Sequence, residues 1–473
     1  MSRLPLSISQ KDIWTELLAW PNTCHLNIGG FSRIRGHIDK DVYQQALDQL
    51  TAANDALRLV PNLNGEQVLL DDYRHLVTYQ DFSNSDNGVE LANEWQQNWM
   101  TQPFEIGDTP PIRFALVSAA NDLHYCVIQS LHIAMDGWSL SNTVQKLGQH
   151  YTAILSGDDS VIEQSRSYQD FIADSLKYKS SKTFDKDLAF WDSHFQTLPE
   201  PVFDVRYNTS NSSGIAKANI ESCQVPRHLV NSLQELVSAN NCTLFHCFVG
   251  LLAIYICKSQ NRKEFIIGVP SLNRSGGKYK STLGMFVGVI PIRIAIEEGA
   301  TPSDIIQDIS KSLKQAYRHA KYPLSEQFKR LDVIKQGRDR LFDVIFSFEE
   351  FVFASQYGDA QVGATNQTFS GFSRYPLAIS VCDFLESEDA EMVLEGNEQF
   401  FSSAETQLIG QRLLFLGEQI LTSFTQPIDC LTINTRHEQQ RLITAGLSLA
   451  SNPQAVLPFH KIIAQKAELD PKA

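Results

Sequence analysis

Hydrophobic and polar residues alternate along two neighbouring stretches of the chain, 110–117 and 124–131. This alternation is typical of half-buried strands, and the turn residues 120–122 between them predict a hairpin. The next stretch, 139–156, has apolar residues at spacings of three and four, which predicts a helix. Asp39 is expected to cap a further helix that carries an apolar stripe from Val42 to Leu57.

The second part of the chain repeats this mixture of helices and strands. Helices are expected to begin at Pro226 and Thr301 and to cover 244–257 and 408–424, and strands are expected at 264–270, 342–348, 376–383 and 391–395. A polar stretch, 177–187, is expected to bridge the two parts. The pattern therefore predicts a mixed α/β chain with two lobes and no internal repeat.

Composition narrows the class of protein. A length of 473 residues with 43% hydrophobic residues fits two sizeable cores plus an appendage. The net charge of −14 argues against nucleic acid or an anionic membrane as a partner. No apolar run reaches membrane-spanning length and no secretory segment opens the chain, so a cytoplasmic location is expected. Eight cysteines without a Cys-x-x-Cys pair predict reduced thiols and no metal site.

One stretch combines residues that can take part in catalysis. His132 follows the second predicted strand directly, and Asp136 and Gly137 come four and five residues later. A histidine at this position can accept a proton near neutral pH. Asp136 can pin the turn or neutralise a buried arginine. On spacing alone, a structural His–Asp pair is the more frequent explanation.

The wording of this stretch resembles the core signature of the condensation domains of nonribosomal peptide synthetases, His-His-x-x-x-Asp-Gly. The chain matches it at His132, Asp136 and Gly137 and departs from it at Leu131, where the first histidine would stand. Six further stretches resemble family motifs and occur in the family order: 4–7 (with Gln10 and Trp14), 55–58, 167–171, 284–293, 319–323 and 342–348. Two of them depart from the motif: 55–58 lacks the His-Glu of the family, and 284–293 has Gly288 in place of an asparagine. The likeness runs from about residue 3 to about residue 435.

The resemblance implies a particular α/β (α+β) architecture. We expect two lobes, each like chloramphenicol acetyltransferase, in a V-shaped pseudo-dimer with a central tunnel. The lobes are expected at 1–175 and 176–435. The remainder, 436–473, resembles a linker toward an adenylation domain.

The resemblance also implies an amide-forming acyltransferase. Its donor is an acyl or peptidyl thioester, on coenzyme A or a donor carrier protein, and its acceptor is the amine of an aminoacyl thioester on a peptidyl carrier protein. Because the chain begins at Met1, we expect it to acylate the first residue of a lipopeptide or siderophore. Phosphopantetheine carries the substrates, and no cofactor or metal bound by the domain itself is expected. No Gly-x-Ser-x-Gly elbow is present, so no covalent acyl-enzyme is expected.

Site residues follow from the same resemblance. His132 is the expected base. Asp136 and Gly137 are expected to support it, with Arg293 as the partner of Asp136 and Arg58 as the alternative. The tunnel candidates are Trp138, Tyr168, Asp170, Gly288 and Ser347. Leu131 should point to the opposite face of the strand from His132, because neighbouring strand residues alternate.

Three alternatives stay open at this point. The changes at Leu131 and Gly288 are compatible with an inactive docking or recruitment module, for which a blocked tunnel would be the sign. A free-standing acyltransferase with a soluble amine substrate is a further alternative. An epimerisation domain shares the His-x-x-x-Asp core, whereas heterocyclisation domains carry aspartate where His132 stands.

Overall fold

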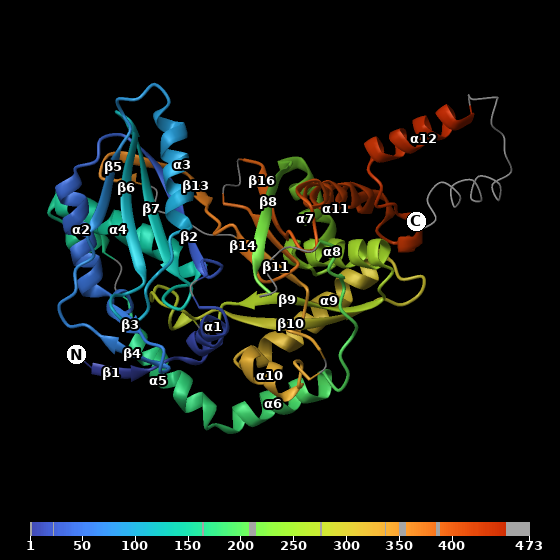
Figure 1. Ribbon diagram of the computed structural model, residues 1–473, viewed down its shortest axis with the longest axis horizontal. Helices are drawn as coiled ribbons and strands as arrows, with labels where there is room; N and C mark the ends of the chain where they lie inside the picture. Colours follow the sequence, from blue (N-terminus) through green and yellow to red (C-terminus); the bar gives the residue numbers. More distant parts are fainter. Residues whose placement is uncertain are drawn as a thin grey trace.

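The computed structural model describes residues 2–21, 23–162, 165–207, 214–274, 277–335, 337–349, 356–384 and 388–450. Figure 1 shows two lobes side by side, the first coloured blue to cyan and the second green to red. The stretch 456–473, which resembles a lead-in to an adenylation domain, lies outside the described residues. No helix in the described ranges is both long and apolar enough to cross a bilayer.

The first lobe is built on a six-stranded sheet in the order β12-β13-β2-β7-β6-β5, with a small sheet β1-β4-β3 beside it. Helices α2 and α4 cover one face of the large sheet, and α3 covers the other. The elements are β1 (Ser2–Pro5), α1 (Ile8–Ala19), β2 (Asn27–Arg35), α2 (Lys40–Ala53), η1 (Asp55–Arg58), β3 (Leu59–Pro61), β4 (Glu66–Leu69), β5 (Val77–Asp81), α3 (Gly88–Met100), β6 (Ile112–Ala120), β7 (Leu123–Leu131), α4 (Gly137–Ser156), η2 (Asp159–Val161) and α5 (Tyr168–Lys179).

The second lobe is built on a seven-stranded sheet in the order β10-β9-β11-β15-β16-β8-β14. Its core lies between this sheet and helices α7, α8, α9 and α11. This part of the chain also contains β12 and β13, which belong to the first sheet. In chain order the elements are α6 (Lys182–His194), β8 (Ala216–Val225), α7 (Arg227–Ser238), α8 (Leu244–Gln260), β9 (Glu264–Ser271), β10 (Gly288–Ala295), α9 (Pro302–Ala316), η4 (Tyr317–His319), α10 (Leu324–Arg330), β11 (Val344–Glu349), β12 (Gln356–Tyr357), β13 (Ala360–Gln367), β14 (Phe372–Ser373), β15 (Leu377–Cys382), β16 (Ala390–Asn397), α11 (Ser403–Ser423), η5 (Ile428–Cys430) and α12 (Arg436–Ala450).

The two lobes exchange elements. Helices α5 and α6 run beneath both lobes in Figure 1 and form the bridge that the polar stretch 177–187 predicted. In the opposite direction, β13 leaves the second lobe and pairs with β2 of the first, with Thr365 opposite Ser32. Residues 356–367 come from the second part of the chain and join the first sheet. The lobe limits 1–175 and 176–435 stay a prediction.

A half-buried carboxylate also joins the lobes. Asp12 on α1 accepts hydrogen bonds from the backbone N–H groups of Leu324 and Ser325 at 3.2 and 3.1 Å, at the start of α10. Burial raises the pKa of the Asp12 carboxyl to about 6. This contact fixes α10 against α1 on one side of the space between the lobes.

The expected elements agree with the structure, with shifts at their ends. The predicted hairpin is β6 and β7, and the predicted helix at 139–156 is α4. Helix α4 begins earlier, at Gly137, because the Asp136 carboxylate caps it. Helix α11 begins at Ser403, because Ser402 and Glu405 form a capping box.

Candidate active site

His132 stands at the point where β7 ends. Its backbone N–H donates to the carbonyl of Leu26 at 2.9 Å, which holds the residue against the end of β2. Its ring Nδ1 lies 3.0 Å from the carbonyl oxygen of Met135. A carbonyl only accepts, so this contact places the proton on Nδ1 and leaves the lone pair on Nε2.

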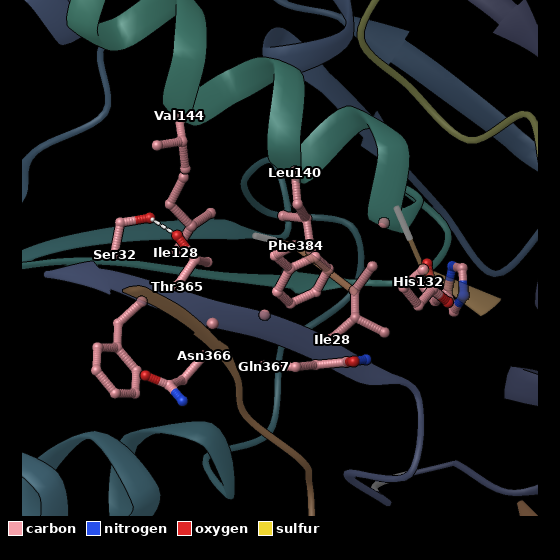
Figure 2. Close-up of a pocket in the computed structure, with 15 residues that line it drawn as sticks. Ile28, Ser32, Ile128, His132, Leu140, Val144, Thr365, Asn366, Gln367 and Phe384 are labelled. Atoms are coloured by element: carbon pink, nitrogen blue, oxygen red, sulfur yellow. Dashed lines mark hydrogen bonds between the residues drawn. The ribbon is translucent and has the colours of Figure 1, made fainter. Parts of the chain in front are cut away.

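The half-buried imidazole lines two cavities. One, of about 150 Å³, lies between α4 and the first sheet and is also lined by Ile28, Leu140 and Val144. The other, of about 520 Å³, is bounded by α1, α10 and the start of β10. Figure 2 shows His132 at one end of the smaller cavity, with Ser32 and Thr365 at the other. The ring therefore borders a cavity on each of two sides.

Leu131 points away from both cavities, as the strand alternation predicted. Its side chain is 3% exposed and packs in a small apolar cluster. The other buried members of that cluster are Leu6, Leu17, Leu26 and Ile133. An apolar residue at position 131 therefore completes a core and removes nothing from the surroundings of His132.

The Asp136 carboxylate is fully buried and fully engaged. Oδ1 accepts from the backbone N–H of Ser139 at 2.8 Å, which caps α4. Oδ2 accepts from the N–H groups of Phe286 and Val287 at 3.0 and 3.2 Å. Asp136 thus joins the His132 turn to the segment that leads into β10 in the second lobe.

The cation that pairs with Asp136 is Arg274, which the sequence did not indicate. Its Nη2 lies 3.0 Å from Oδ1 of Asp136, and both side chains are almost completely buried. The expectation that Arg293 pairs with Asp136 is wrong: Arg293 binds Glu264 at 2.8 Å on the partly exposed side of β10. Side chains along β10 point alternately to the core and to the surface. Ile292 and Ile294 lie in the core, so Arg293 between them faces outward.

Arg58 is not the partner either. Its guanidinium donates to the carbonyl groups of Thr51, Leu70 and Asp71. It therefore fixes the chain after β4 to the end of α2. Asp55 lies in the same stretch, 55–58, as Arg58. Its carboxylate accepts hydrogen bonds from the backbone N–H groups of Tyr168 and Gln169 at the start of α5.

Arg274 organises the segment around it as well as Asp136. Nη1 donates to the carbonyl groups of Tyr279 and Thr282 at 2.7 and 2.6 Å, and Nη2 donates to Ser139 Oγ at 2.7 Å. The guanidinium also lies 3.9 Å from the centre of the Phe286 ring. One buried cation therefore holds both sides of the junction between the lobes.

Two of the tunnel candidates brace this junction. Trp138 Nε1 donates to the carbonyl of Lys280 at 2.8 Å. The fully buried Tyr168 hydroxyl donates to the carbonyl of Met285 at 2.5 Å and lies 3.1 Å from Ser7 Oγ. Both side chains therefore hold the segment that binds Asp136. Gly137, the first residue of α4, lines the smaller cavity.

The remaining candidates lie in different places. Gly288 lines the larger cavity at the start of β10. Asp170 is exposed, because Tyr168 and Ile172 of the same helix point inward, so its predicted place in the tunnel is wrong. Ser347 lies on β11, where its hydroxyl donates to that of Ser380 at 2.9 Å.

Glu349, two residues further along β11, is a site residue that the sequence did not indicate. It lines the smaller cavity together with His132. Burial raises the pKa of its carboxyl to about 7, and the negative charge of Asp136 adds to this rise. No motif marks Glu349, because its place beside His132 depends on the packing of the two lobes. Among the described residues, no cluster of His, Cys, Asp and Glu could hold a metal ion.

The comparisons with known proteins identify the family of this chain. The family model of the Condensation domain matches residues 2–443, so the chain belongs to the condensation-domain family. Surfactin synthase subunit 1 from Bacillus subtilis (strain 168) is 28% identical over 98% of this chain, and a dimodular nonribosomal peptide synthase from the same organism is 23% identical over 99%. The chain spans only 13% and 20% of these two relatives.

Solved structures share the fold. The starter condensation domain of rhizomide synthetase, in a variant bound to C8-CoA, has a TM-score of 0.81 and 19% identity, and the match covers 91% of this chain and 98% of that one. The first condensation domain of the calcium-dependent antibiotic synthetase, with a substrate analogue, has a TM-score of 0.81 and 18% identity over 92% and 100%. The predicted two-lobed, chloramphenicol acetyltransferase-like fold is confirmed.

The buried pair predicts a large difference between two arginine substitutions. Arg274→Met leaves the Asp136 charge buried without its cation, so we expect a loss of about 3–5 kcal/mol in the free energy of unfolding. Arg293→Met removes a partly exposed pair with Glu264 and hydrogen bonds to His194 and Thr197, and leaves no charge buried, so it should cost less, about 1–2 kcal/mol. Urea denaturation of both variants measures the difference. Equal losses would contradict the assignment of Arg274.

The Glu349 carboxyl predicts a pH dependence of stability. Its pKa rises from an ordinary value of 4.5 in the unfolded chain to about 7 in the folded one. The folded state therefore binds the Glu349 proton more tightly than the unfolded chain does. The contribution of the protonated carboxyl to the free energy of unfolding is complete below about pH 4.5 and is lost as the pH rises through about 7.

Glu349→Gln, which cannot ionise, should remove this loss. Relative to the variant, the wild-type protein should lose up to about 3 kcal/mol between pH 5 and pH 8. Chemical denaturation at several pH values measures this, with the exposed Glu235→Gln as the control. Parallel pH profiles for wild type and Glu349→Gln would count against the interpretation.

Proposed function

We propose that this chain is the condensation domain of a nonribosomal peptide synthetase and forms an amide bond between an acyl thioester and the amine of an aminoacyl thioester. The observation that carries the proposal is the place of His132: its Nε2 carries the lone pair, and the ring lines cavities on two sides. A module that only recruits a partner would need neither cavity.

The chemistry needs no covalent acyl-enzyme. The amine nitrogen attacks the thioester carbonyl carbon, and the tetrahedral species collapses with cleavage of the C–S bond. His132 Nε2 accepts the proton that the amine loses and passes it to the departing sulfur. Holding the two substrates in line can supply about 7–11 kcal/mol, and a positioned base adds about 10²–10⁴-fold.

The smaller cavity fits the donor acyl group. Apolar side chains form a continuous part of its wall, beside polar residues such as Glu349 and Gln367. The apolar residues are Ile28, Phe31, Ile128, Leu140, Val144 and Phe384. The cavity follows β2 from Ile28 to Ser32, a distance of about 13 Å for four strand residues. At the end away from His132, the hydroxyl groups of Ser32 and Thr365 bind each other at 2.8 Å.

This shape favours a starter reaction, in which a hydrocarbon chain occupies the smaller cavity and the first aminoacyl group comes from the larger one. The donor would be an acyl group on coenzyme A or on a donor carrier protein, and the acceptor would be carried by a peptidyl carrier protein. A downstream adenylation domain and a cytoplasmic location belong to the same proposal. Phosphopantetheine is then part of each substrate.

His132→Ala is expected to lower the turnover rate by about 10²–10⁴-fold, because it removes the base. The fold should remain, since the ring is half-buried, and its unfolding midpoint should match that of the wild type. The measurement is the intact mass of a charged acceptor carrier protein after incubation with acyl-coenzyme A donors. A loss of less than tenfold would show that His132 is not the base.

The donor assignment has its own test. Val144 is 5% exposed and lines the smaller cavity near Ser32, so Val144→Phe should fill the far end of that cavity. We expect kcat/KM to fall at least tenfold for long acyl chains and little for short ones, because each misfitted methylene costs about 1–3 kcal/mol.

The exposed Leu155 on the same helix provides the matched control, Leu155→Phe, which should leave the chain-length preference unchanged. Equal losses for short and long donors in Val144→Phe would place the acyl chain elsewhere. Amide formation only with carrier-bound peptidyl donors would replace the starter reaction by elongation.

A further inference from the structure

Gly288 is a departure from the family pattern, which favours asparagine at this position. The residue opens β10 and lines the larger cavity that reaches His132. A glycine offers no side chain for that wall, so another group has to occupy the space. The structure shows which group this is.

The carboxamide of Asn273 occupies the volume beside Gly288. A Cβ atom on residue 288 would lie 3.0 Å from Asn273 Nδ2, a contact so tight that the amide would have to move by a few tenths of an ångström. Asn273 has a φ of +50°, a left-handed conformation that asparagine tolerates better than most residues. A full asparagine side chain at position 288 would therefore compete with Asn273 for one place.

Asn273 uses its amide to hold the segment that binds Asp136. Nδ2 donates to the carbonyl of Phe286 at 3.1 Å, and Oδ1 accepts from Ser271 Oγ at 3.4 Å. The N–H of the same Phe286 donates to the Asp136 carboxylate at 3.0 Å. Asn273 is also the neighbour of Arg274, so two successive side chains act on the support of His132.

Asn273 also borders a second cavity. Asn273 lines a cavity of about 150 Å³ beside α5, together with Phe171 and Tyr279. Gly288 lines the larger cavity. Removal of the Asn273 side chain would open the wall next to Gly288 and give water a second way to a bound thioester.

We propose that Asn273 is a positioning residue of the catalytic turn and supplies, from the segment after β9, the carboxamide that position 288 lacks. It fixes Phe286 and closes the wall of the larger cavity. This inference rests on the proposed amide-forming function for its kinetic effect. Its claim about shared space is independent of that function.

A double-substitution cycle tests the inference, with Asn273→Gly, Gly288→Asn and the two combined. Glycine keeps the left-handed backbone at 273, so only the amide is lost. Asn273→Gly should lower kcat about tenfold with little change in KM, and should raise the fraction of donor thioester hydrolysed to free acid. Gly288→Asn alone should also lower kcat, because two amides then compete. The combined variant should return to within about threefold of wild type.

Asn261 provides the matched control, because it is also left-handed, with a φ of +53°, and lies at the end of α8. Asn261→Gly should leave kcat and hydrolysis unchanged. Additive losses in the combined variant, or an Asn273→Gly variant with wild-type kcat and hydrolysis, would overturn the proposal.

Failure of the proposed function gives a different result. If the wild-type chain forms no amide with any donor, the same four proteins are compared by their thermal unfolding temperatures. The combined variant should then unfold at a higher temperature than Gly288→Asn alone, since the competing side chain is gone. A combined variant that unfolds at the same or a lower temperature would overturn the shared-space claim itself.

Discussion

The buried Asp136 carboxylate is the constraint on which the rest of the site depends. It takes a hydrogen bond from the start of α4, two from the backbone before β10 and an ion pair from Arg274. These donors come from both lobes. A charge with no exposed surface is tolerated only when its acceptor sites are filled, so the carboxylate holds the lobes in one register. The position of His132 between two cavities follows from that register.

The contacts between the lobes explain why the fold needs elements that cross from one to the other. β13 extends the first sheet from the second lobe, and its Thr365 forms one end of the smaller cavity with Ser32. On the other side, Asp12 caps α10 from α1. Each cavity at His132 therefore has walls from both lobes. A single lobe would contain His132 but would lack the two cavities that the ring lines.

Local features of the site could be predicted from the sequence, and distant contacts could not. The strand, turn and helix around His132, and the opposite orientation of Leu131, follow from periodicity and alternation within 20 or so residues. Arg274 is separated from Asp136 by 138 positions, and no periodic pattern links them. The outward direction of Arg293 follows from its place between the buried Ile292 and Ile294, whereas the family resemblance alone points to Asp136 as its partner.

The contacts around the site leave His132 in a state that can act as a base. Asp136 lies four residues from His132, but its oxygens are taken up by Arg274 and by backbone N–H groups, so it does not compete for the proton of an incoming amine. Glu349 shares the smaller cavity, and burial raises the pKa of its carboxyl to about 7, so near neutral pH much of it is uncharged. The Met135 carbonyl fixes the proton on Nδ1 of His132. The lone pair on Nε2 of His132 is therefore available to accept a proton from a group bound in the cavities that the ring lines.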